Sequence, residues 1–178
     1  GEGLWGHTAV ASEDGVAAAI AVSVRRFGRI DVRYSCAGGS VPADSYITDV
    51  DLAVWQHTMS LDLLGPMLCC RHAIPEIIKA GGGAVVNMSS GAALAGSGGI
   101  AYTASKGGVN ALTRAVAYQH AADNIRCNTV CPGAIDTPMM HRSFEKLGMT
   151  NLPIAPGRIP RTGRAEEVPG LVTTLAPG

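Results

Sequence analysis

The chain has 178 residues, 47% of them hydrophobic, and its fourteen basic residues balance fourteen acidic ones without forming a charged block. This length favours one domain with a sizeable core, and the balanced charge argues against a nucleic-acid surface or an anionic-membrane surface. We see neither an apolar run of the roughly 18 residues that span a membrane nor a signal-peptide pattern.

The first residues, GEGLWG (1–6), formally match the G-x-G-x-x-G pattern of dinucleotide-binding loops. Such a loop works between a strand and a helix, because the N-terminus of that helix holds the pyrophosphate. No strand pattern precedes this match and no amphipathic pattern follows Gly6, so we do not interpret it as a cofactor loop. A second match, GSGGIA (96–101), opens a helix with other chemistry and is interpreted as an active-site loop.

Ser12 and the two acidic residues after it predict the start of a helix that runs to Phe27. The segment RIDVRYSCAGG (29–39) then predicts a strand that closes on glycines. Asp49 or Asp51 is expected to cap a long helix.

The long helix is expected over residues 51–79. Its apolar stripe consists of Leu52, Val54, Met59, Leu63, Met67, Leu68, Ile74 and Ile77. Pro66 and Pro75 interrupt this pattern and should bend the helix.

Five cysteines fall on expected strands and a helix instead of framing loops, which is typical of a protein in the reducing cytoplasm. Cys69, Cys70 and His72 raise the alternative of a metal site. Adjacent cysteines on a helix converge poorly on one ion, and the spacing of Cys127 and Cys131 on a strand is no better. We therefore predict buried structural thiols and no metal site.

Residues 84–106, AVVNMSSGAALAGSGGIAYTASK, begin as a buried strand, end as the first turns of a helix, and contain Ser90, Tyr102 and Lys106. Tyr102 and Lys106 are four positions apart and therefore share a helix face. An ammonium about 4 Å from a phenol, at an effective dielectric of about 20, favours the phenolate by about 4 kcal/mol. That is roughly what moves a tyrosine pKa from about 10 to about 7.

These three residues together predict a proton-transfer site for a carbonyl or an alcohol, with Ser90 holding the substrate oxygen. The alternative is an ordinary solvated pair of Tyr102 and Lys106 on a helix surface.

The segment IRCNTVCPG (125–133) predicts a further strand. Residues 139–160 are apolar and broken by prolines without a steady period, which suits a lid over a substrate pocket or an ordinary surface connection. A last helix should start near Arg164, and Pro169 should shift that start by a turn. Alternating strands and helices predict a doubly wound α/β fold with a parallel sheet.

Several segments, VVNMSS (85–90), YTASKGGV (102–109), and IRCNTVCPG with DTPM (136–139) after it, resemble the short-chain dehydrogenase/reductase family. The resemblance extends from about Val10 to Leu175. It implies a Rossmann-like sheet with helices on both faces and NAD(P)-dependent oxidoreductase activity, with Ser90, Tyr102 and Lys106 as catalytic residues. The interval from Ser90 to Tyr102 is one residue shorter than the commonest family spacing, so Ser89 is a possible substitute.

The resemblance also implies where NAD or NADP would bind. The expected cofactor contacts are Cys36, Ala37, Gly38, Tyr102, Lys106, Pro132, Gly133 and Thr137. Asp62 stands where the family has a catalytic asparagine that orders a proton-relay water. A charge at this position could compete with Tyr102 for Lys106.

Two departures from the family pattern shape the remaining expectations. The chain starts to match at the end of the family's third strand, beyond the glycine-rich phosphate loop, and Ala9 stands in place of an adenine-contacting aspartate. We therefore expect residues 1–178 to form one partial, N-terminally truncated domain that lacks the family's final strand, exposes a sheet edge and binds dinucleotides weakly.

The expected substrate is a small apolar alcohol or ketone. Helices 51–79 and 102–122 carry apolar residues on more than one face, and the family buries such helices in subunit contacts, so a homodimer or homotetramer is expected. The alternative function is a non-catalytic relative that serves as an oligomerising or binding domain.

Overall fold

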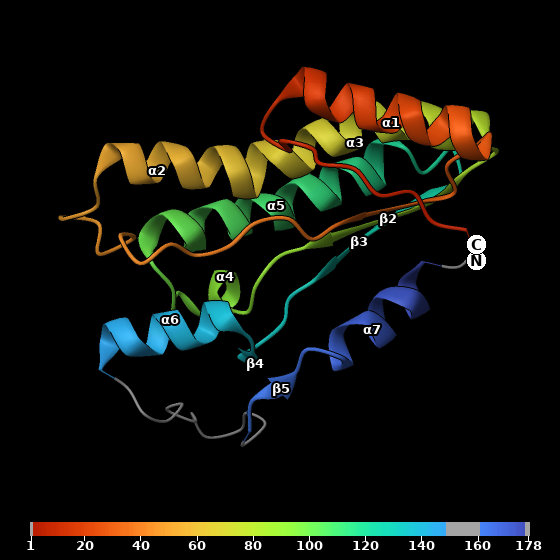
Figure 1. Ribbon diagram of the computed structural model, residues 1–178. Helices are drawn as coiled ribbons and strands as arrows, with labels where there is room; N and C mark the ends of the chain where they lie inside the picture. The colour runs from red at the N-terminus through yellow and green to blue at the C-terminus, as the bar shows by residue number, and fades with distance from the viewer. Residues whose placement is uncertain (1, 149–160, 177–178) are drawn as a thin grey trace.

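Three parallel strands form the central sheet in the computed structural model, which describes residues 2–148 and 161–176 (Figure 1). Their order is β1 (Val32–Ser35), β2 (Gly83–Met88) and β3 (Ile125–Val130), with β2 in the middle. The parallel pairing of all three strands confirms the predicted sheet. A separate parallel pair joins β4 (Ile135–Asp136) to β5 (Gly163–Arg164).

Helices cover both faces of this sheet. They are α1 (Glu13–Phe27), α2 (Leu52–Met59), α3 (Gly65–Lys79), α4 (Ala92–Ala95), α5 (Ile100–Gln119), α6 (Pro138–Leu147) and α7 (Glu167–Leu175). Helices α1, α3 and α5 lie on one side of the sheet and α7 lies on the other (Figure 1). The expected arrangement of a doubly wound α/β fold is therefore present.

The predicted helix starts have the expected chemistry. The Ser12 side chain accepts a hydrogen bond from the Gly15 amide at 3.3 Å, and Asp51 accepts one from the Ala53 amide at 2.6 Å. Asp51, and not Asp49, is thus the cap of α2. Side-chain oxygens at these positions satisfy amides that the helix leaves without partners.

A turn of π-helix, Ser60–Leu64, separates α2 from α3. It is followed by Gly65 and then by Pro66, which lies in the first turn of α3, where a missing amide hydrogen costs little. The expectation that Pro75 interrupts the helix is wrong, because α3 continues through it to Lys79. Ile77 on this helix is fully buried, and such burial offsets the lost hydrogen bond.

The expected lid segment is only partly described. Its first half is a regular helix, α6, capped by Thr137, and not the aperiodic stretch that the sequence indicated. Residues 149–160 of the proposed lid lie outside the described residues. Helix α7 begins at Glu167, with Pro169 in its first turn, so the expected shift of the start is confirmed.

The core lies on both faces of β2. Val85 packs with Ile77 and Val116 from α3 and α5, whereas Val86 on the opposite face packs with Val172 of α7. Successive side chains of a strand point to opposite faces, so an unbroken apolar run suits a strand covered on both sides.

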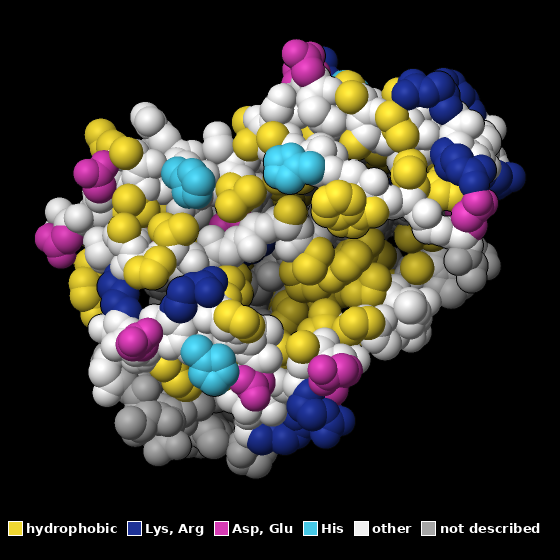
Figure 2. Space-filling model, in the orientation of Figure 1, with side chains coloured by type: hydrophobic (Ala, Val, Ile, Leu, Met, Phe, Trp, Pro, Cys, Tyr) yellow, Lys and Arg dark blue, Asp and Glu magenta, His cyan; other side chains and the backbone are white. Residues whose placement is uncertain are grey.

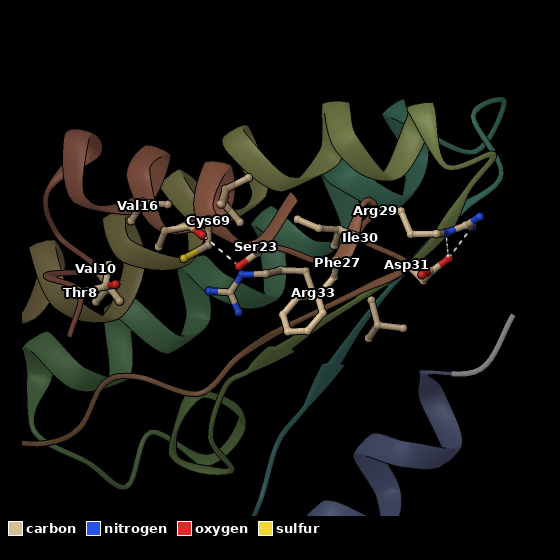
Figure 3. Close-up of a pocket in the computed structure, with 13 residues that line it drawn as sticks. Thr8, Val10, Val16, Ser23, Phe27, Arg29, Ile30, Asp31, Arg33 and Cys69 are labelled. Carbon is tan, nitrogen blue, oxygen red and sulfur yellow. Dashed lines mark hydrogen bonds and ion pairs between the residues drawn. The ribbon is translucent and has the colours of Figure 1, made fainter. Parts of the chain in front are cut away.

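The outer edge of β1 has no strand partner among the described residues. Beside it, a groove of about 600 Å³ runs between β1 and α1, and Figure 2 shows hydrophobic side chains gathered in the hollow between α1 and α7. Val16 and Phe27 of α1 line this groove, with Arg33 of β1 across from them (Figure 3). An open strand edge beside apolar surface is a template for pairing with another strand.

Gly83 offers a stability test of the sheet. A Cβ at this position would overlap the Asp31 carbonyl oxygen, so Gly83→Ala should reduce the free energy of unfolding by about 1–3 kcal/mol. A Cβ at Gly170 in α7 would meet nothing within 4 Å, and Gly170→Ala should add roughly 0.5–1 kcal/mol by helix propensity. Urea denaturation measures both changes. Equal effects of the two substitutions would contradict the close approach at Gly83.

Candidate active site

The carboxyl end of β2 and the first turns of α5 bring Ser90, Tyr102 and Lys106 together. Tyr102 is 8% exposed and Lys106 is 3% exposed, so the pair is not the solvated surface pair of the alternative interpretation. The Lys106 Nζ atom lies 5.6 Å from the centroid of the Tyr102 ring, and the Ser90 side chain lies near enough to the Tyr102 hydroxyl to lower the pKa of Tyr102. A buried phenol beside a half-buried serine hydroxyl and an ammonium can hold and move a proton.

The two neighbouring serines have different partners. The Ser89 hydroxyl donates to the backbone carbonyl of Lys106 at 2.8 Å and thereby ties β2 to α5. The Ser90 oxygen accepts from the Ala92 amide at 3.1 Å and faces Tyr102. This geometry favours Ser90 over Ser89 as the serine of the site.

Asp62 enters the cluster from the π-helical turn between α2 and α3. Its side chain is fully buried, its Oδ1 atom lies 3.5 Å from Lys106 Nζ, and the same oxygen accepts from the Gly39 amide at 2.7 Å. The Oδ2 atom has no hydrogen-bond partner among the described residues. A Cβ on Gly38, whose φ is 144°, would overlap Asp62 Oδ1, so this turn requires glycine.

The electrostatic environment of Tyr102 differs from the expectation that Lys106 lowers the pKa of this tyrosine. Burial raises the pKa of Tyr102, the hydrogen bond with Ser90 lowers it, and the charge of Asp62 raises it again. Lys106 is engaged elsewhere, since its Nζ contacts Asp62 and donates to the Met88 carbonyl at 3.2 Å. Burial likewise raises the pKa of Asp62, against the lowering effect of Lys106. The expectation of a Tyr102 pKa near neutrality is therefore wrong for this geometry.

The other predicted cofactor residues follow the carboxyl ends of the strands. Cys36, Ala37 and Gly38 come directly after β1, and Pro132 and Gly133 come after β3. Ligands of open α/β sheets bind at this edge.

The Thr137 hydroxyl forms hydrogen bonds with neighbouring backbone groups. Its hydroxyl donates to the Ile135 carbonyl at 3.2 Å and accepts from the Met140 amide at 3.4 Å as the cap of α6. Its contact with a cofactor stays a prediction.

This edge of the sheet offers partners for the ribose and carboxamide of a nicotinamide dinucleotide but not for its phosphates. The ammonium and hydroxyls of Lys106, Tyr102 and Ser90 suit ribose hydroxyls and a carboxamide, and a Cβ at Gly133 would meet open space, so the backbone there is approachable. Neither glycine-rich match offers a phosphate cradle. Residues 2–9 belong to no helix or strand, and the start of α5, after residues 96–99, is occupied by Asp44.

Asp44 is the residue of this site that the sequence analysis missed. It lies in the connection between β1 and α2, and its carboxylate accepts hydrogen bonds from the Ala101 and Tyr102 amides at 3.1 and 2.9 Å. An aspartate 57 residues before Ala101 carries no local signal of a cap, because capping patterns are read from adjacent residues.

Four further features remain to be considered: a metal site, a membrane-spanning helix, the cysteines and the groove beside β1. Within residues 2–148 and 161–176, no three His, Cys, Asp or Glu side chains converge as metal ligands, and no helix is long and apolar enough to cross a membrane. Cys69, Cys70 and Cys127 are buried and unpaired. The groove beside β1 is lined by none of Ser90, Tyr102, Lys106 and Asp62, and its charged pair, Arg29 and Asp31, is exposed (Figure 3).

Known proteins similar to this chain are named as dehydrogenases or reductases. Residues 4–177 match the family model described as enoyl-(acyl carrier protein) reductase. The chain is 40% identical over 169 residues to a short-chain type dehydrogenase/reductase of Bradyrhizobium diazoefficiens, with 93% of this chain and 60% of the relative covered. It is 37% identical over 174 residues to cis-4-hydroxycyclohexanecarboxylate dehydrogenase of Sinomonas cyclohexanicum, with 97% and 69% covered.

Solved structures give the same result for the fold. The structure of ElxO with NADP bound superposes with a TM-score of 0.85 at 28% identity, with 95% of this chain and 68% of that chain covered. The chain thus spans 60–69% of the length of the proteins named.

Replacing Asp62 with asparagine should lower the pKa of Tyr102, because it removes the charge that raises this pKa and keeps an acceptor for the Gly39 amide. Tyrosinate absorbance during titration measures the change once the curve of the Tyr102→Phe variant is subtracted. The control is Asp136→Asn, which alters an exposed aspartate paired with His141 and should leave the curve in place. An unchanged Tyr102 pKa in Asp62→Asn would show that Asp62 does not act on the phenol.

Proposed function

Because this chain belongs to the short-chain dehydrogenase/reductase family, we propose that it is an NAD(P)-dependent oxidoreductase acting on a secondary alcohol or ketone. The observation that carries the proposal is the burial of Tyr102 and Lys106 next to Ser90 at the carboxyl end of β2. A bound nicotinamide would supply or accept the hydride. Its expected contacts are the residues 36–38, Pro132 and Gly133 at the strand ends, besides the catalytic side chains.

Tyr102 has the proton-transfer role in this proposal. In reduction, its hydroxyl gives a proton to the carbonyl oxygen of the substrate, and in oxidation the tyrosinate takes the proton from the alcohol. The Ser90 hydroxyl, which lies beside Tyr102, donates to the same substrate oxygen and holds it in place. Burial keeps competing water away from the Tyr102 hydroxyl.

Lys106 stabilises the tyrosinate that proton donation leaves behind, and Asp62 opposes it by sharing the ammonium at 3.5 Å. Burial and Asp62 raise the pKa of Tyr102, so the hydroxyl keeps its proton at neutral pH. This protonation state suits a proton donor. We therefore infer that the site is better adapted to ketone reduction at neutral pH and that oxidation requires more alkaline conditions.

The proposed substrate is a small, mainly apolar alicyclic alcohol or ketone. Support comes from the relative named for its action on a hydroxycyclohexanecarboxylate and from the mostly uncharged site, whose charged side chains Lys106 and Asp62 neutralise each other. Cyclohexanone and cyclohexanol, each with both nicotinamide cofactors, are suitable probes.

A second candidate function, a binding or oligomerising domain without catalysis, is favoured by one observation. Asp62 forms an ion pair with Lys106, and this ion pair weakens the stabilisation that Lys106 gives to a tyrosinate. Cofactor binding without any turnover in the assay described below would favour this candidate.

We also predict self-association of the full chain. Leu52 on α2 and Tyr118 on α5 are 73% and 88% exposed, and apolar surface of this kind favours burial in a subunit contact. Light scattering should report a dimer or tetramer at micromolar concentration. A monodisperse monomer would contradict the prediction.

The decisive experiment replaces Tyr102 with phenylalanine. Loss of the proton-transferring oxygen should lower kcat for cyclohexanone reduction by at least about a hundredfold, with only a small change in cofactor affinity in calorimetry. Tyr118→Phe is the matched control, since it removes the same atom from an exposed residue of the same helix and should leave kcat unchanged. Equal turnover of wild type and Tyr102→Phe would refute the proposed role.

A further inference from the structure

We propose that Asp44 is a positioning residue of the proposed reaction, which holds the first turn of α5 and thereby the place of Tyr102. Asp44 is 5% exposed, and both of its carboxylate oxygens face the start of α5. Oδ1 accepts from the Ala101 amide at 3.1 Å and Oδ2 accepts from the Tyr102 amide at 2.9 Å. The second of these bonds is made to the backbone of the proton-transferring residue itself.

Among the residues that the structure describes, no other side chain caps the start of α5. Its N-cap residue is Gly99, which has no side-chain oxygen. Beside the two bonds to Asp44, the Ile100 amide donates to the Ser45 carbonyl at 3.1 Å. Three consecutive amides of α5 are therefore held by residues 44 and 45, and a charged acceptor makes the stronger kind of bond among them.

Gly99 is the glycine that this approach requires. A Cβ there would overlap the Asp44 carboxylate, although the φ of Gly99, −58°, is open to any residue. The requirement is therefore one of space and not of backbone conformation. Any side chain at position 99 must displace the carboxylate from the two amides.

Asp44 is also anchored from outside the site. Lys146 of α6 donates from Nζ to the Asp44 backbone carbonyl at 2.9 Å. The residue thus connects α6, the described part of the expected lid, to the helix that carries Tyr102. This hydrogen bond restrains the backbone of Asp44 and thereby helps to hold its carboxylate in place.

The contact of Asp44 with α5 affects the distance between the Tyr102 oxygen and the substrate oxygen. Proton transfer requires the Tyr102 oxygen within hydrogen-bonding reach of the substrate oxygen, and a displacement of about 1 Å can cost about a hundredfold in rate. Asp44 touches neither substrate nor cofactor in this proposal, so it acts through Tyr102. Its loss should therefore lower kcat without weakening cofactor binding.

A purely structural cap is the alternative role, and Asp51 provides the matched control. Asp51 caps α2 through the Ala53 amide and has no contact with Tyr102. Both Asp44→Ala and Asp51→Ala should lower thermal stability. Only Asp44→Ala should lower kcat, by about ten- to a hundredfold with KM for the cofactor unchanged, and Asp44→Asn, which keeps one carbonyl acceptor, should fall between wild type and alanine. Equal kcat losses in Asp44→Ala and Asp51→Ala would overturn the proposal.

Gly99→Ala gives a second test that keeps every polar group. It should reproduce the kcat loss of Asp44→Ala, and the double variant should be no slower than the slower single variant, because both changes break the same contact. Additive losses would overturn the proposal. This variant and Asp44→Asn also serve if Asp44→Ala does not fold.

The inference rests on the proposed function for its kinetic readout, so one measurement is independent of turnover. Amide hydrogen exchange at Ala101 and Tyr102 should accelerate at least about tenfold in Asp44→Ala relative to wild type, whereas Asp51→Ala should leave both amides protected. A wild-type chain without turnover would refute the proposed function and leave this exchange test in force. Unchanged protection of both amides in Asp44→Ala would refute the role of Asp44.

Discussion

A buried ammonium needs partners, and the partners of Lys106 connect most of the site. Removing an ammonium from water costs several kcal/mol unless charge and hydrogen bonds replace the lost solvation. Lys106 receives both, from the Asp62 carboxylate and from the Met88 carbonyl at the end of β2. Helix α5, the π-helical turn and the central strand are thus held to one another by a single side chain.

The ion pair of Lys106 and Asp62 also constrains the surrounding backbone. The Asp62 carboxylate approaches the turn after β1 so closely that residue 38 must be glycine, and the Gly39 amide supplies its hydrogen bond. The π-helical turn contributes an extra residue where α2 meets α3, and Asp62 lies on that turn. Irregular turns of this type within helices often coincide with functional sites, and here the turn delivers a charge to the core.

The same constraint limits the chemistry. An ammonium shared with a carboxylate stabilises a tyrosinate less than a free one, so the pair that looks like a tuned acid in the sequence holds its proton more tightly in the folded chain. The turn with Asp62 contributes to this outcome, and the segment with Asp44 holds the backbone of Tyr102 at the start of α5. The reactivity of Tyr102 therefore depends on groups that lie beyond its own helix.

The sequence by itself determined the helix cap at Ser12, a cap of α2 at either Asp49 or Asp51, the parallel strands and the shared helix face of Tyr102 and Lys106, because these features depend on neighbouring residues and on fixed spacing. Only the tertiary structure showed the different partners of Ser89 and Ser90, the choice of Asp51 as the cap of α2 and the passage of α3 through Pro75.

It also decided the raised pKa of Tyr102 and the contact of Asp44 with the start of α5. Burial and contacts between residues 40 to 60 positions apart determine these features, and no local pattern encodes a desolvation cost or a partner brought near by folding.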